Sequence, residues 1–150
     1  MFSLLFIVKF VHIITSMVYF GLPFAFGRWF SNISSGTGDL NSGVAVMKRF
    51  TFLHLNLCAV ILGGTGLYLS ITMGYWTMST WPHMALLLLI LSVFNLNFNL
   101  GLALKKVMGA SDDGSLAEAL KRHTRMRILV FSAVHHTLIT AATALMIFRV

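Results

Sequence analysis

The sequence has very few charged residues, and the acidic ones are the scarcest. Aspartate and glutamate together number 4 among 150 residues, and all charged residues make up 10% of the chain, against about 25% in a soluble globular domain. So few charges cannot cover a surface exposed to water, which excludes a soluble domain of ordinary composition. The single cysteine, Cys58, excludes an internal disulfide and a CxxC metal or redox motif.

Several sequence motifs of known chemistry are also missing. The chain contains no HExxH, no P-loop, no Cys/His zinc spacing and no CxxCH site for haem c. Its nine methionines are scattered rather than clustered, which weakens a copper-relay interpretation. The net charge of +7 comes from basic residues placed between apolar runs, so we expect a lipid bilayer with anionic headgroups as the neighbour, and no nucleic acid.

Long apolar runs account for most of the sequence, of which 57% is hydrophobic. About 20 apolar residues cross the hydrocarbon core of a bilayer, and backbone groups in lipid must bond within their own segment, which favours helices. The first run lacks a basic n-region and contains Lys9 and His12, so we interpret it as a retained helix rather than a signal peptide. The sequence therefore predicts a single all-α domain, an integral membrane four-helix bundle running antiparallel, up-down-up-down, with spans at about residues 4–26, 50–73, 83–104 and 128–148.

The connections between these spans differ in charge. The first, residues 27–47, is a polar loop, the second, residues 74–82, is short and aromatic, and the third, residues 105–127, is charged. Nine basic residues fall on the side of the first and third loops: Arg28, Lys48, Arg49, Lys105, Lys106, Lys121, Arg122, Arg125 and Arg127. Only Lys9 and Arg149 fall toward the other side. The positive-inside rule then predicts cytoplasmic first and third loops, outer N- and C-termini, and a bacterial-type inner membrane.

Polar side chains inside the spans are costly in lipid and usually mark function. The first span carries such residues on one face: Lys9, His12, Ser16 and Tyr19. The fourth span also carries polar residues on one face: Ser132, His136, Thr140 and Thr143. His135 lies about 100° away around that helix. His54, Cys58 and Thr65 align on the second span. At about 1.5 Å per residue, the histidines of the first and fourth spans reach similar depths near the bilayer middle.

Facing imidazoles on neighbouring helices are the ordinary ligands of a b-type haem. We therefore interpret His12, His135 and His136 as candidate haem-iron ligands, with His54 as a further candidate for cofactor binding. Lys9 could pair with a haem propionate, and Gly63, Gly64 and Gly66 could let a flat macrocycle approach the backbone. The alternatives are interhelical hydrogen bonds for the histidines, a helix-packing seam for the glycines, and snorkelling for the lysine.

The third span contains an asparagine-rich stretch, FNLNFN. Asn95 and Asn99 share a helix face and Asn97 points elsewhere, so the three amides cannot all contact one neighbour. We expect them to link helices by bonding to His or Thr across the bundle, or to bond to another subunit.

Four segments carry a family resemblance: VKFVHIITSMVYFG, MKRF, GGTGLYL and WPHMALLLLIL. In order and spacing they resemble the HemJ-type protoporphyrinogen oxidases and the related CopD-like four-helix membrane proteins. The resemblance implies a four-helix membrane fold, oxidation of protoporphyrinogen IX, a functional His12 and bound haem b. The chain differs in its third span, where Met84 and Ala85 stand in place of the family's lysine.

Three functional hypotheses follow. The leading one is a haem-b-binding subunit that works in electron transfer or anchors a membrane redox complex, respiratory or photosynthetic. The second is a HemJ-like protoporphyrinogen IX oxidase, which would make the protein an oxidoreductase. The third is an accessory membrane subunit without a cofactor. The near-absence of extramembrane residues favours the third hypothesis over a free-standing enzyme that acts on a soluble substrate. Besides lipid, we expect the partners to be other membrane subunits of a larger complex or a second copy of the chain.

Overall fold

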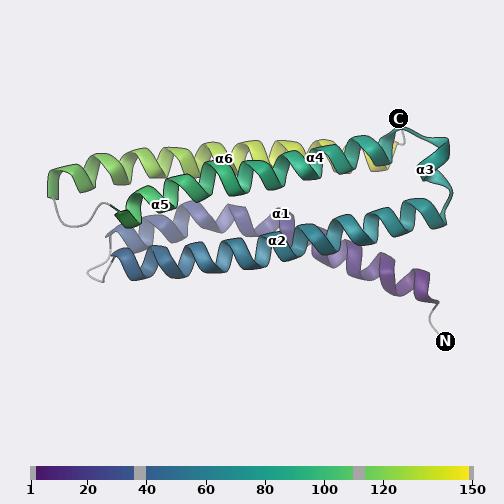
Figure 1. The fold of residues 1–150 in the computed structure, drawn as a ribbon, viewed down its shortest axis with the longest axis horizontal. Helices are drawn as coiled ribbons and strands as arrows, with labels where there is room; N and C mark the ends of the chain where they lie inside the picture. The colour runs from purple at the N-terminus through teal and green to yellow at the C-terminus, as the bar shows by residue number, and fades with distance from the viewer. Residues whose placement is uncertain (1–2, 36–39, 110–113, 149–150) are drawn as a thin grey trace.

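The computed structural model describes residues 3–35, 40–109 and 114–148, and these are almost entirely helical, with no strand among them. The helices are α1 (Leu4–Ser35), α2 (Leu40–Thr72), α3 (Tyr75–Met78), α4 (Trp81–Asn95), a π-helical turn η1 (Leu96–Leu100), α5 (Gly101–Gly109) and α6 (Gly114–Phe148). α4, η1 and α5 follow one another as a single rod, so four rods lie along one another and the short α3 links two of them (Figure 1). The predicted all-α four-helix architecture is confirmed.

Four helices are long and apolar enough to cross a membrane: Leu4–Asn32, Ser42–Thr72, Trp81–Lys106 and Arg122–Phe148. They overlap the four predicted spans, but they extend further at the end that carries the first and third connections. The predicted polar loop at 27–47 is wrong over most of its length, because α1 continues to Ser35 and α2 begins at Leu40. Residues 36–39 lie outside the described part. Hydropathy marks only the stretch that suits lipid, whereas backbone hydrogen bonds let a helix continue beyond it.

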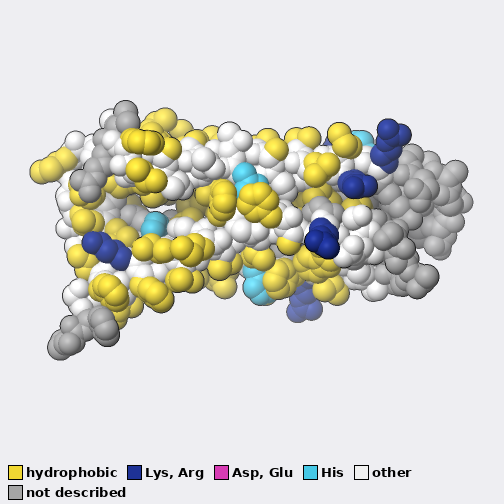
Figure 2. Space-filling model, turned by 180° about the vertical axis from the view of Figure 1, so that it is seen from behind, with side chains coloured by type: hydrophobic (Ala, Val, Ile, Leu, Met, Phe, Trp, Pro, Cys, Tyr) yellow, Lys and Arg dark blue, Asp and Glu magenta, His cyan; other side chains and the backbone are white. Residues whose placement is uncertain are grey.

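The two ends of the bundle differ in charge. Basic side chains gather toward one end, which we call the basic end (Figure 2): Arg28, Lys48, Arg49, Lys105, Lys106, Arg122, Arg125 and Arg127. Both chain termini and α3 lie at the opposite end, which we call the α3 end (Figure 1). The positive-inside argument requires this separation of basic residues between the two ends. That the basic end faces the cytoplasm stays a prediction.

The tightly packed core occupies the middle of the bundle and its basic half. Its largest fully buried side chains include Tyr19, Phe26, Phe30, Met47, Leu100, Leu104 and Phe131. Large apolar side chains on the outer faces of all four rods are exposed, as a surface against lipid requires: examples are Phe10, Leu57, Phe94 and Val130. Toward the α3 end, glycines and small side chains replace the large core residues, and a cavity opens there.

The asparagines of the third span satisfy one another and two neighbouring helices. Asn97 exchanges side-chain hydrogen bonds with Asn56 on α2, at 3.3 and 3.1 Å. The Asn99 amide donates to Asn95 Oδ1 at 2.6 Å, and Asn95 donates to the Phe131 carbonyl on α6 at 3.3 Å. The predicted bonding across the bundle is confirmed, but the partners are Asn56 and the Phe131 carbonyl rather than His or Thr. The π-helical turn η1 contains two of these amides.

Gly101 begins α5 at a close contact with α2. A Cβ at this position would lie 2.7 Å from Cζ of Phe52. We expect Gly101→Ala to destabilise the protein by about 1 kcal/mol, because overpacking costs about 1–3 kcal/mol and alanine returns up to about 1 kcal/mol of helix propensity. Gly64→Ala is the matched control: its Cβ meets nothing within 4 Å, so it should stabilise the helix slightly. Unfolding in detergent would measure both variants, and equal stability of the two would contradict the contact.

Candidate functional site

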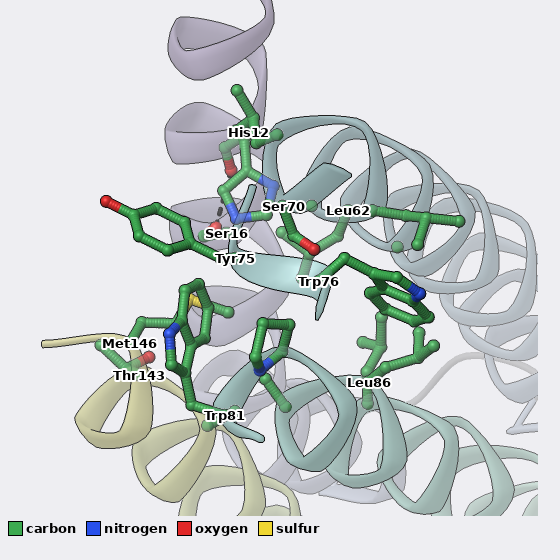
Figure 3. A pocket seen from close by; sticks show the side chains of 18 of the residues that line it. His12, Ser16, Leu62, Ser70, Tyr75, Trp76, Trp81, Leu86, Thr143 and Met146 are labelled. Carbon is green, nitrogen blue, oxygen red and sulfur yellow. Dashed lines mark hydrogen bonds between the residues drawn. The ribbon is translucent and has the colours of Figure 1, made fainter. Parts of the chain in front are cut away.

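A cavity of about 250 Å³ lies at the α3 end of the bundle, between all four rods (Figure 3). Its volume lies below the range of about 300–1,000 Å³ that is usual for ligand sites. Its walls are mostly apolar and aromatic, with Trp76 on α3 and Trp81 on α4 among them. The few polar groups on the wall are therefore the ones that could orient a ligand.

His12, half-buried on α1, is the one histidine on this cavity wall. Its Nδ1 lies 2.8 Å from Oγ1 of Thr65. The Thr65 hydroxyl donates its proton to a carbonyl of its own helix, at Ile61 (2.6 Å), so it can only accept from the imidazole. His12 in its neutral form therefore carries its proton on Nδ1, and Nε2 keeps a free lone pair. A histidine that binds a metal through one ring nitrogen usually donates a hydrogen bond from the other, and this bond fixes the tautomer and the orientation of the ring.

The glycines of the GGTG run have three different surroundings. A Cβ on Gly66 would lie 3.1 Å from Cε1 of His12, so the missing side chain is what lets the imidazole lie against α2. Gly63 faces Leu89 of α4, with 3.4 Å between its ideal Cβ and Cδ2, and also lines the cavity. Gly64 is exposed and does not line the cavity. The structure thus places Gly63 and Gly66 at the predicted site and leaves Gly64 outside it.

Ser70 contributes a buried polar group without a partner. The residue is 4% exposed, and its Oγ has no hydrogen-bond partner among the described residues. Its hydroxyl points into the cavity in Figure 3. A buried polar group left unbonded costs about 1–3 kcal/mol, and a ligand with an oxygen or nitrogen atom would remove that cost.

His135, which is 0% exposed, belongs to a closed hydrogen-bond ring with Tyr19 and Ser92. Its Nε2 lies 2.9 Å from the Tyr19 carbonyl, which can only accept, so a neutral His135 carries its proton on Nε2. Ser92 therefore donates to Nδ1 (2.8 Å) and accepts from the Tyr19 hydroxyl (3.2 Å). Both nitrogens of His135 are thus used in joining α1, α4 and α6.

Pro23 explains why these bonds are needed. Proline has no N–H, so the carbonyl four residues earlier, that of Tyr19, loses its α-helical donor. His135 supplies the missing donor from α6, and Ser132 of α6 donates to the carbonyl of Pro23 itself at 3.0 Å. Side chains of neighbouring helices commonly satisfy such groups in membrane proteins.

His136 binds at the same proline turn. Its Nε2 lies 3.0 Å from the Phe20 carbonyl and its Nδ1 lies 2.5 Å from the Ser132 carbonyl. Both ring nitrogens therefore face backbone oxygens, and neither faces the cavity. For His135 and His136 the structure favours the alternative of interhelical hydrogen bonding over metal ligation.

The first and fourth helices do not bring their histidines into opposition. His135 and His136 contact α1 at Tyr19 and Phe20, which is seven to eight residues, or roughly 11 Å at 1.5 Å per residue, from His12. The expected similarity in depth is wrong because the registry of the helices could not be read from span ends. Among the described residues, no group of three or more His, Cys, Asp or Glu side chains could hold a metal ion.

Two further predicted residues lie away from the cavity. His54 is exposed on α2, with its ring stacked on Phe50 at 4.0 Å and its Nδ1 at 2.8 Å from that residue's carbonyl. Lys9 is exposed one turn before His12 and does not line the cavity. Sequence reasoning missed the unpaired hydroxyl of Ser70 and the role of Pro23. The proline was a readable signal, since a proline inside a span always leaves one carbonyl without its donor.

Comparison with known proteins identifies a family for the chain. A family model described as "Predicted integral membrane protein (DUF2269)" matches residues 6–150. No curated protein and no solved structure matches the chain significantly. The match confirms an integral membrane protein, and the resemblance to HemJ-type and CopD-like proteins stays a prediction.

Proposed function

The chain belongs to the DUF2269 family of predicted integral membrane proteins, and we propose that it is a haem-b-binding subunit of a membrane redox system, in which His12 would hold the haem. The proposal rests on how the two ring nitrogens of His12 are hydrogen-bonded. The Thr65 hydroxyl accepts a hydrogen bond from Nδ1, which leaves the lone pair of Nε2 available to a metal at the wall of an apolar cavity.

The other cavity residues suit such a cofactor. Gly66 lets the imidazole lie against α2 at the cavity wall, and Trp76 and Trp81 supply aromatic surface. The unpartnered hydroxyl of Ser70 could bond to a polar substituent. When bound, haem would supply one-electron chemistry, and burial and axial ligation would set its potential.

A pyridine haemochrome spectrum of the purified protein tests the proposal. The protein should be produced in a host that makes haem and also measured after addition of haemin to the detergent-solubilised protein. We expect the spectrum of haem b at a ratio approaching one per chain. No haem b in either preparation, from protein that elutes as a single species, would refute the proposal.

A second candidate is the HemJ-like protoporphyrinogen IX oxidase. It is supported by the same placement of His12, which stands in the K-x-x-H-I opening that resembles that family, since a porphyrinogen would need the same cavity. Complementation of a strain lacking protoporphyrinogen oxidase separates the two functions. Haem binding without complementation, despite good expression, favours the electron-transfer subunit.

Gly66→Ala should weaken the site without unfolding the protein. The added methyl would lie 3.1 Å from Cε1 of His12, so the ring must shift by a few tenths of an ångström away from α2. We expect haem content to fall by only about twofold, because a shift of a few tenths of an ångström approaches but does not exceed the about 0.5 Å within which ligands must keep their geometry. Gly64→Ala adds the same methyl on the exposed side of the same helix turn and should leave haem content unchanged. A larger loss in Gly64→Ala would place the cofactor elsewhere.

A further inference from the structure

The size of the cavity at the α3 end limits what it can hold. Its volume is about 250 Å³, and an engineered apolar cavity of about 150 Å³ in another protein binds benzene. The cavity therefore has room for one substituted six-membered ring with its walls as they stand. A tetrapyrrole such as haem contains four linked rings, so its entry would require the helices to move apart.

The wall of the cavity favours a neutral, flat molecule. None of the described side chains that line it is charged, and Trp76 and Trp81 supply aromatic surface. A charge buried among apolar groups without a partner is costly. The wall therefore disfavours carboxylates, phosphates and ammonium groups.

Two polar groups on the wall keep hydrogen-bonding capacity for a ligand. Ser70 is 4% exposed, its Oγ has no partner among the described residues, and its hydroxyl points into the cavity (Figure 3). His12 can only accept through Nε2, because Nδ1 carries the ring proton and donates to Thr65. The hydroxyls of Ser16 and Thr143, also on the wall, already donate to carbonyls of their own helices. A matching ligand offers a hydrogen-bond donor to His12 and an oxygen to Ser70.

The two groups lie about one helical turn apart along α2. His12 rests against Gly66, with 3.1 Å between its Cε1 and an ideal Cβ at that glycine. Ser70 follows Gly66 by four residues on the same side of the helix, which is roughly 6 Å at 1.5 Å per residue. Two oxygens at opposite corners of a six-membered ring are separated by a similar distance, so the spacing suits such a ring.

The cavity also reaches the outer surface of the bundle. Leu67 and Met146 line it and are 37% and 38% exposed. The first half of α1 diverges from the other rods toward this end (Figure 1). A ligand with a long apolar tail can therefore place its ring in the cavity and leave its tail in the bilayer.

We propose that the cavity binds the head group of a membrane quinol, a neutral ring with two opposed hydroxyls and an apolar tail. One hydroxyl donates to Nε2 of His12, and the other oxygen bonds to the hydroxyl of Ser70. The oxidised quinone has no O–H to donate to His12, so the site favours the reduced form. The inference goes beyond the proposed haem and does not rest on it, because the cavity cannot hold both.

Quenching of tryptophan fluorescence by decylubiquinone tests the proposal, since Trp76 and Trp81 lie on the wall. In detergent-solubilised protein without oxygen, we expect saturable quenching at a ratio approaching one per chain. Decylubiquinol, added as a competitor, should displace the quinone at a several-fold lower concentration than unlabelled quinone would need. Decylbenzene, which has a ring and the same tail without the oxygens, should compete poorly.

Ser70→Ala should weaken binding of both forms by about two- to tenfold, the loss expected for one hydrogen bond. It should not lower the stability of the protein, because the hydroxyl has no partner there. Thr72→Ala is the matched control, since Thr72 is exposed on α2 and does not line the cavity; it should bind like the wild type. His12→Ala should remove the preference for the quinol, and Ala85→Leu, which adds bulk to the wall from α4, should abolish binding.

Three outcomes would overturn the proposal. The first is quenching that does not saturate or is equal in the wild type and Ala85→Leu, which would show partition into the micelle. The second is equal competition by decylbenzene and decylubiquinol, which would show that the oxygens are not recognised. The third is haem b in the wild-type protein with no quinone binding, which would leave the proposed function intact. Quinone binding by haem-free protein that takes up no haemin would support the proposal and refute the haem.

Discussion

Replacement of His12 by alanine is expected to reduce haem b in the purified protein by at least tenfold. His12 is the one histidine on the cavity wall, and the lone pair of its Nε2 is left free because Nδ1 donates to Thr65. Loss of the residue that hydrogen-bonds to a metal ligand typically costs about 10- to 100-fold in metal affinity. Loss of the ligand itself should cost at least as much. The haemochrome spectrum, normalised to protein, measures the effect.

The design of that experiment separates ligation from folding. His54→Ala is the matched control, because His54 is exposed on α2 and lies away from the cavity; it should keep its haem. Thr65→Val should give an intermediate loss, since it removes the hydroxyl that fixes the His12 ring while keeping its volume. Full haem content in His12→Ala would contradict the proposed ligand directly.

His135→Ala should have the largest effect on stability, a loss of about 3 kcal/mol in the free energy of unfolding. The substitution removes a fully buried ring, leaves the Tyr19 carbonyl without its donor and removes the acceptor of the Ser92 hydroxyl proton. A stranded buried polar group costs about 1–3 kcal/mol, and a large-to-small change in a core costs about 2–5 kcal/mol. Titration with a denaturing detergent would measure the change, and Thr137→Ala, at an exposed site on the same helix, should be nearly neutral.

A double-mutant cycle with Pro23 tests the reason for that loss. Pro23→Ala restores the backbone N–H that the Tyr19 carbonyl lacks, so His135→Ala should cost about 1 kcal/mol less in this background. Additive effects of the two substitutions would show that His135 stabilises the bundle by packing alone. In either result, haem content distinguishes this role from ligation, because the double mutant should still bind haem through His12.

The number and type of the helices could be predicted from the sequence because the bilayer imposes both. Runs such as 83–104 have the length and composition that lipid demands, and no other backbone conformation suits them. The helix ends at the basic end could not be predicted in this way. Residues after Phe26 are polar enough to leave the lipid, yet α1 continues to Ser35, and hydropathy contains no term for a helix that extends into water.

The candidate site was only partly predictable, since helix rotation and registry are set by packing. His12 and Gly66 were both identified from the sequence, but their contact was not, because it depends on how α1 lies against α2. His135 and His136 were assigned to the cofactor from their depth alone. In the structure they bond to the carbonyls of Tyr19 and Phe20 in the turn before Pro23, about two helical turns from His12. Ser70 could not be distinguished from a packing serine until its hydroxyl was found without a partner.

The bond between His135 and the Tyr19 carbonyl has a consequence for biosynthesis. The two residues are 116 positions apart in the chain, which a ribosome covers on the order of ten seconds at about 5–20 residues per second. During that interval the first span lies in the membrane with a carbonyl that has no helical donor and an unassembled proline turn. The Tyr19 carbonyl can therefore acquire its donor from His135 only after the last helix has been synthesised.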